Sequence, residues 1–258
     1  MRAVILPLLK LLDRSHVERA ADVASPPFWK RILFGERTPK TREDPEKHVL
    51  DDEMSQHNRV RTMQSAFGGP NAERIRYMES HGSLIPIDKI VHVEQVSIFM
   101  MSDGTVVSFF GISGDDIEPP ILNRLFSDKT LLRTSSDPSM MLQAIIDSIV
   151  DLLFPVVAAY QDSIAELELT VLTDPSIKQS QDLYILTSEL SLLKSTIAPI
   201  AAVVTSLRDH RRNYTKNAMN GVEVSDMTRV YLGDVMDHVL LILDVCCPPH
   251  DPRTSDAR

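Results

Sequence analysis

The chain has 258 residues, a formal net charge of −9 at pH 7, 43% hydrophobic residues and 5% aromatic residues. This composition is typical of a folded protein whose core is filled by aliphatic side chains. The charge is uneven, because residues 1–90 hold 15 Lys/Arg and 13 Asp/Glu, whereas residues 91–258 hold 12 and 23. The resulting balances of +2 and −11 argue against nucleic-acid binding, which needs a basic surface.

The cysteines and the longest apolar runs indicate a soluble chain from a reducing compartment. Cys246 and Cys247 are adjacent, so neither a disulfide framework nor a zinc site is indicated. No run reaches the roughly 18 consecutive apolar residues that span a bilayer. The run at residues 3–12 is interrupted by Pro7 and Lys10. It has a faint signal-peptide character, a minor alternative because no small-residue cleavage site follows.

Residues 1–89 are predicted to form a charged, partly disordered N-terminal region. Pro26-Pro27, the isolated Pro39 and Pro45, and Gly68-Gly69 interrupt it, and residues 42–61 contain almost no large apolar side chain. Five potential metal ligands gather there, but a solvated charged segment is the preferred interpretation: His48, Asp51, Asp52, Glu53 and His57.

Residues 90–135 are predicted to form a small α/β domain, and we expect ordered structure to begin near Ile90. Residues 91–101 and 105–110 have the composition of strands, and Asp103-Gly104 between them indicates a β-hairpin. Both strand faces carry apolar residues, so the hairpin should lie in a sheet covered by helices. Pro119-Pro120 should open a short helix through residue 126. Residues 131–135 are interpreted as a short strand.

Residues 136–212 are predicted to form a long helical hairpin. In residues 137–174, apolar side chains recur every three or four positions, which is typical of one stripe on a helix about 55 Å long. Ser136 or Asp137 should cap it and Pro138 suits its first position. Pro155 should bend it. A second helix over residues 176–210 follows a short connection and must therefore run antiparallel.

A third helix is predicted over residues 226–245, followed by a disordered tail at residues 246–258, since Pro248-Pro249 cannot continue a helix. The fold class is therefore α+β. No catalytic motif is found, so we expect no enzyme. Asp147 and Asp151 lie one helical turn apart and could share a cation with oxygen atoms of a partner. Two solvated carboxylates are the preferred interpretation of this pair.

Four segments in order resemble the cytosolic domain of the CorA family of magnesium transporters, with the fungal type closest. They are EQVSIFMMSDGTVVSFF, SMMLQAIIDSIVDLLFPVVAAYQDSIAELE, LYILTSELSLLKSTIAPI and VYLGDVMDHVLLILD, which together cover roughly residues 91–245. The resemblance implies a small α/β/α sandwich, a long helical hairpin and the start of a stalk helix. It also implies a pentamer and a regulatory Mg²⁺ site between subunits, to which Asp234 would contribute. Gly233 stands before Asp234 where the family has Arg.

The chain also departs from that family. The Gly-Met-Asn pore motif and both membrane helices are absent, and residues 1–90 lack the segment that supplies the opposing carboxylate. We therefore expect a truncated, transport-incompetent cytosolic regulatory domain of a CorA-like transporter of Mg²⁺ or another divalent metal ion. It would self-associate or assemble with full-length subunits, reach the membrane only through them, and be cytoplasmic alone. The alternative is a soluble helical-hairpin interaction or scaffold protein derived from the family.

Overall fold

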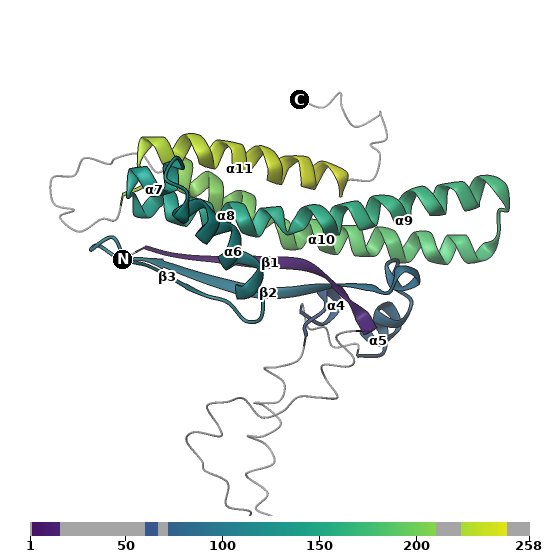
Figure 1. Cartoon of the computed structure of the whole chain (residues 1–258). Helices are drawn as coiled ribbons and strands as arrows, with labels where there is room; N and C mark the ends of the chain where they lie inside the picture. The colour runs from purple at the N-terminus through teal and green to yellow at the C-terminus, as the bar shows by residue number, and fades with distance from the viewer. Residues whose placement is uncertain (1, 16–59, 67–71, 210–222, 247–258) are drawn as a thin grey trace, which may run out of the picture.

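The computed structural model describes residues 2–15, 60–66, 72–209 and 223–246. A three-stranded antiparallel sheet carries a layer of long helices, and two of these helices continue beyond the sheet as an arm (Figure 1). The predicted α+β class is confirmed, because a β-hairpin is followed by a long helical hairpin and a third helix.

The sheet begins at the N-terminus of the chain. Strand β1 (Arg2–Asp13) pairs along its whole length with β2 (Lys89–Met100), with Arg2 opposite Met100. The prediction that ordered structure begins near Ile90 is therefore wrong. Pro7 and Lys10 suggested interruptions, but β1 is an edge strand, where proline is tolerated. The Nζ atom of Lys10 lies 2.5 Å from Oδ2 of Asp116.

The predicted β-hairpin is confirmed. Strand β3 (Val106–Phe109) pairs with the end of β2, and the backbone N–H of Met101 donates to the carbonyl of Thr105 at 2.8 Å. Gly104 has φ of +88°, which glycine adopts without a steric penalty. The Asp103 side chain accepts a hydrogen bond from the Thr105 N–H at 3.0 Å, which stabilises the turn.

Glu94 fixes the segment after β3 onto β2. Its carboxylate accepts hydrogen bonds from the N–H groups of Ile112 at 2.7 Å and Ser113 at 3.3 Å. Burial acts to raise the pKa of Glu94, but hydrogen bonds from His92, Ile112 and Ser113 outweigh it and lower the pKa to about 2. A Cβ at position 111 would lie 2.7 Å from Oε2 of Glu94, so Gly111 allows this close approach without displacing the carboxylate.

Two short helices differ from the prediction. Helix α6 (Gly114–Phe126) begins five residues before Pro119-Pro120, and acidic residues in its first turn favour that start. The prediction that the proline pair opens the helix is wrong. Residues 131–135 form helix α7 (Leu131–Ser135), so the predicted strand is also wrong. Five residues are too few for their periodicity to separate a strand from a helix.

The long helical hairpin consists of α8 (Pro138–Asp151), α9 (Leu153–Thr173) and α10 (Ile177–Asp209). The predicted single first helix is interrupted at Leu152. Pro155 lies three residues after this interruption and cannot donate a hydrogen bond to the carbonyl of Asp151, four residues earlier. Helices α9 and α10 run antiparallel, as predicted (Figure 1). The predicted cap Asp137 is confirmed, since its side chain accepts a hydrogen bond from the Ser139 N–H at 2.8 Å.

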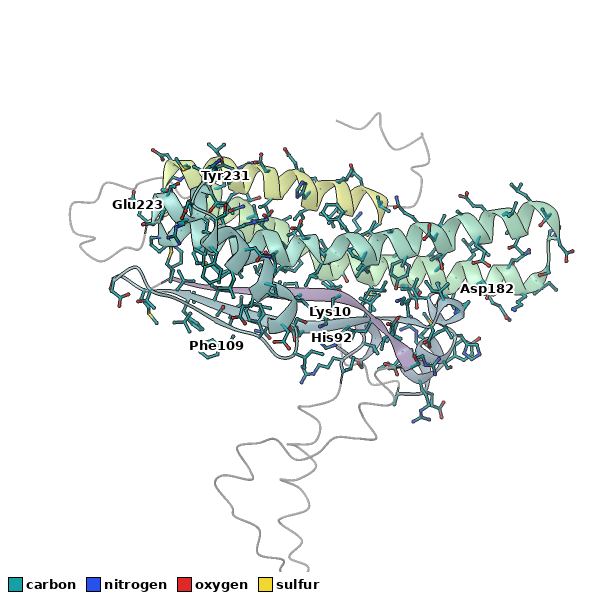
Figure 2. The ribbon with its side chains drawn as sticks, viewed as in Figure 1. Lys10, His92, Phe109, Asp182, Glu223 and Tyr231 are labelled. Carbon is teal, nitrogen blue, oxygen red and sulfur yellow. The ribbon has the colours of Figure 1, made fainter. Side chains whose placement is uncertain are left out.

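The main core lies between the sheet and these helices. Val96, Ile98 and Met100 alternate along β2 and are buried against the helical layer. On the opposite face of the sheet, Ile5 and Phe109 are more than half exposed, and Figure 2 shows Phe109 directed away from the helices. Helices α4 (Met63–Ala66) and α5 (Ala72–Ser80) lie near the start of β2, beneath the hairpin in Figure 1.

Glu189 marks the point where the hairpin leaves the sheet. Its carboxylate on α10 accepts a hydrogen bond from the Ser83 N–H at 3.1 Å, and the Ser163 hydroxyl on α9 donates to the Ser83 carbonyl at 2.8 Å. A Cβ at Gly82 would lie 2.8 Å from Oε1 of Glu189. Glu189 is 6% exposed, and burial raises its pKa. The loop before the 3₁₀ helix η1 (Ile85–Ile87) is thus fixed to both α9 and α10.

Two helical stretches, Pro138–Thr173 and Ile177–Asp209, are long and apolar enough to cross a membrane by length and composition. The most apolar part of the first is 67% buried in the fold, and that of the second is 39% buried. Core helices of soluble proteins have the same properties, so this is weak evidence for a membrane location.

Candidate cation site between α8 and α11

A hydrogen-bonded cluster joins the N-termini of α8 and α11 (Asp226–Val245). The Ser139 hydroxyl lies 2.8 Å from the Thr228 hydroxyl and accepts a hydrogen bond from the Ser225 N–H at 3.2 Å. Ser225 also caps α11 by accepting from the Thr228 N–H at 3.2 Å. Burial acts to raise the pKa of Asp137, but hydrogen bonds from Ser225, Ser139 and Thr228 lower it. Both helices therefore start at one anchored point.

This common start places three potential ligands at the same height. Asp147 and Asp151 lie nine and thirteen residues after the first residue of α8, and His238 lies twelve after that of α11. At about 1.5 Å per residue, these positions are about 13 to 20 Å from the paired N-termini. The two carboxylates share one face of α8, since they are one turn apart. The similar distances of the three side chains from the helix starts therefore result from the paired caps and the regular rise of the helix.

The three side chains form a compact group. One ligand atom from each of Asp147, Asp151 and His238 lies within 4.8 Å of the other two. Asp147 also forms an ion pair with Arg124 of α6, with 2.9 Å between Nη1 and Oδ2. The side chain of Arg124 is 39% exposed and that of Asp147 is 18% exposed. A cation bound here would share Asp147 with the guanidinium.

The cluster contains two carboxylates, and Arg124 offsets part of their negative charge. Partial burial and the negative charge of Asp147 raise the pKa of Asp151, whereas Arg124 and His238 act to lower it. The Nδ1 atom of His238 is buried and has no hydrogen-bond partner within the described ranges. The ring packs edge-on against Phe154, with centroids 5.5 Å apart. A neutral imidazole is a suitable metal ligand, and one ring nitrogen of His238 belongs to the group of three.

The donor set fits a divalent cation in part. Ligand atoms on one ion at about 2.1 Å lie about 3 to 3.5 Å apart. The three ligand atoms lie within 4.8 Å of one another, close enough to bind one ion directly after small side-chain movements or through a water molecule. Magnesium typically keeps several waters and prefers oxygen ligands, while imidazole also suits transition metals. Asp147, Asp151 and His238 are the residues that would hold such an ion.

The residues singled out from the sequence have different places in the fold. Asp147 and Asp151 are brought together with His238, a potential ligand that sequence reasoning missed. Asp234 is exposed on α11, one turn before His238, and lies outside the group of three. The segment with His48, Asp51, Asp52, Glu53 and His57, interpreted as solvated, falls outside the described residues.

Comparison with models of protein families finds no match to this chain, and comparison with curated protein sequences finds none either.

Proposed function

We propose that this chain is the cytosolic regulatory domain of a CorA-like transporter of divalent metal ions. The observation that carries the proposal is the group of Asp147, Asp151 and His238, in which two helices of an acidic region direct ligand atoms to one point. The order of the elements supports it as well, because a small sheet domain is followed by a long antiparallel hairpin and a third helix beside it.

In this proposal, cytosolic Mg²⁺ binds the acidic helices and holds them in one arrangement, and its loss releases them. Asp234 contributes to a regulatory site between subunits. Its exposure supports this role, because a carboxylate on the outer surface of α11 can meet an acidic residue of a neighbouring copy. The group around His238 acts within one subunit and links α8 to α11.

A soluble helical-hairpin interaction protein is the second candidate function. It is favoured by the apolar side chains that the arm exposes where α9 meets α10. Leu169, Leu172 and Ile177 are each more than 60% exposed there. Exposed apolar residues gathered in one place often mark a protein–protein contact.

Magnesium titration of the whole chain tests the first candidate. A site with a Kd near 1 mM adds about 1.4 kcal/mol of stability in about 10 mM Mg²⁺, which raises the melting temperature by about 4 °C. Asp151→Asn should remove most of this gain within a single chain. Asp234→Ala should leave the gain of the monomer intact and weaken Mg²⁺-dependent oligomers, as measured by light scattering.

Asp237→Asn is the matched control, because Asp237 is an exposed carboxylate on the same helix outside the group of three. It should retain the full response to Mg²⁺. A melting temperature that Mg²⁺ does not change, in a chain that still self-associates, would contradict the regulatory role and favour the interaction protein.

A further inference from the structure

A second feature with the character of a binding site is the outer edge of strand β1. This strand stands first in the order β1-β2-β3 and, within the described residues, pairs with β2 alone. Ala3 and Ile5 are exposed, whereas Leu8 and Leu9 are 0% exposed. The accessible part of the edge therefore covers residues 3–7, which we call the β1 edge. It lies at the end of the sheet away from the arm (Figure 1).

The hydrogen bonds of β2 determine which backbone groups of β1 face this edge. In an antiparallel pair, the N–H and C=O of one residue point to the same side of its strand, and successive residues alternate. The N–H of Val93 donates to the carbonyl of Arg61. The N–H of Met101 donates to the carbonyl of Thr105. Both acceptors lie on the side of β2 away from β1, so the even-numbered residues of β2 point toward β1.

The pairing register carries this alternation over to β1. Val4 lies opposite Ile98, so the even-numbered residues of β1 exchange hydrogen bonds with β2. The backbone groups of Ala3, Ile5 and Pro7 therefore face outward. Proline fits there because it has no N–H to donate to the sheet. The N–H groups of Ala3 and Ile5 have no backbone acceptor among the described residues.

The side chains at the β1 edge do not protect it against another strand. Natural edge strands are often protected by charged side chains or by proline. Residues 3–7 contain no charged residue, and Pro7 stands only at the end of the accessible stretch. Ile5 is 54% exposed on the outer face of the sheet, in the same row as Ser97 and Phe109. Free backbone donors beside an exposed apolar side chain are recognised by an extended strand.

We propose that the β1 edge pairs antiparallel with the β1 edge of a second copy of this chain, with Ile5 opposite Ile5. In this register each Ile5 N–H donates to the Ile5 carbonyl of the other copy. Each Ala3 N–H donates to the carbonyl of Pro7 of the other copy. All four free N–H groups thus gain an acceptor, and each missing proline N–H leaves only one Ala3 carbonyl without a partner. The two Ile5 side chains pack together on the outer face.

The shape and charge of the chain suit a second copy as the partner. Arg2 would lie opposite Leu8 of the other copy, so the symmetric pairing brings no like charges together. Strand β1 runs toward the arm, so an antiparallel pair directs the two arms in opposite directions (Figure 1). Two five-residue segments bury less than about 1,200 Å², which is typical of a weak dimer. This interface goes beyond the cation-dependent role and does not rest on it.

Sedimentation equilibrium of the full chain tests the proposal, in a chelating buffer that excludes Mg²⁺-dependent oligomers. We expect a dimer with a Kd of about 10 to 100 µM. Ile5→Lys should weaken it at least about tenfold, because two ammonium groups would lie opposite each other. Ile5→Pro should weaken it as well, because it removes the central N–H and keeps an apolar side chain. The sheet itself should tolerate this proline, as it tolerates Pro7.

Phe109→Lys is the matched control, because Phe109 is an exposed apolar residue on the same face but on strand β3. It should leave the Kd unchanged. Melting curves verify that each variant is folded.

Cross-linking with a short bifunctional thiol reagent tests the register. Paired Cα atoms at position 5 would be about 5.5 Å apart, whereas those at position 3 would be about 14 Å apart. Ile5→Cys should therefore cross-link efficiently and Ala3→Cys should not, after subtraction of the signal that the unmodified chain gives. The proposal is overturned if the chain is monomeric at about 500 µM, if Phe109→Lys weakens the dimer as much as Ile5→Lys, or if Ala3→Cys cross-links as well as Ile5→Cys. These outcomes leave the Mg²⁺ response of the chain unaffected, so the two proposals fail separately.

Discussion

The two ends of the helical hairpin have similar sequence patterns and opposite surroundings. Near the sheet, the stripe on α10 is fully buried, with Leu193, Ile197 and Ile200 at 0% exposure. In the arm, beyond the sheet, Leu172 and Ile177 are more than 80% exposed. Apolar periodicity indicates a helix in both places. It does not indicate which elements bury the apolar side chains, because the sheet and α11, which pack on α10, are distant from it in the sequence.

The largest effect should come from removing the same side chain at each end. Leu193→Ala should lower the free energy of unfolding by about 2 to 5 kcal/mol, because it leaves a cavity in a filled core. Leu172→Ala should change it by less than about 0.5 kcal/mol, because solvent fills the space. Urea denaturation monitored by circular dichroism gives both values.

The contrast between the two ends is contradicted if Leu172→Ala lowers the free energy of unfolding as much as Leu193→Ala does. That result would place a covering partner on the arm, for example a second copy of the chain. Repeating the melts over a range of protein concentrations distinguishes a partner from an intramolecular contact.

A smaller effect is expected from the buried carboxylate at the sheet end. The pKa of Glu94 is about 2 in the folded chain, below its ordinary value of about 4.3, so ionised Glu94 stabilises the fold above pH 4.3. That contribution is lost as the pH falls from about 4.3 toward 2. Glu94→Gln should cost on the order of 2 to 3 kcal/mol at pH 7 and remove this part of the acid sensitivity.

Glu168→Gln is the matched variant in the arm, since Glu168 is an exposed carboxylate on α9. It should leave stability at pH 7 and the acid transition almost unchanged. Denaturation at several pH values between about 2 and 7 gives the free energy of unfolding of both variants as a function of pH. An equal loss of acid sensitivity in the two would mean that Glu94 has no special role.

The smallest effect should arise at the junction of the two regions. The pKa of Glu189 is raised by burial, so its charged form is disfavoured and its contribution to stability falls as pH rises above about 4.3. Glu189→Gln keeps an oxygen acceptor for the Ser83 N–H and removes the buried charge. We expect it to stabilise the chain by about 1 kcal/mol at pH 7 and to have no benefit at pH 4. Thermal melts at the two pH values give this difference, and a destabilised variant at pH 7 would contradict it.

The sequence predicted those parts of the fold that depend on interactions between residues close in the chain. The Asp103-Gly104 turn, the cap at Asp137 and the antiparallel hairpin each depend on residues close in the chain. Strand β1 was missed because its partner lies more than 75 residues away, and Pro7 looked like a break until the strand was placed at the edge of the sheet. The start of α6 was misplaced because the proline pair was a stronger signal than the two aspartates before it.

The candidate site was predicted in part. The sequence indicated the pair Asp147 and Asp151, since one helical turn separates them. His238 lies 87 residues beyond Asp151, and only the packing of α11 on α8 brings it there. A usable signal existed, because His238 and the aspartates are about equally far from the two predicted helix starts. That signal required knowing that the helices run parallel from a shared anchor.

The interruption at Leu152 has a mechanical consequence. Helix α9 has 21 residues and extends about 31 Å from that point, so a change of about 5° in its direction displaces the tip of the arm by about 3 Å. Asp151, the residue just before the interruption, belongs to the cation group. A cation bound by Asp151 would therefore act at the joint between α8 and α9.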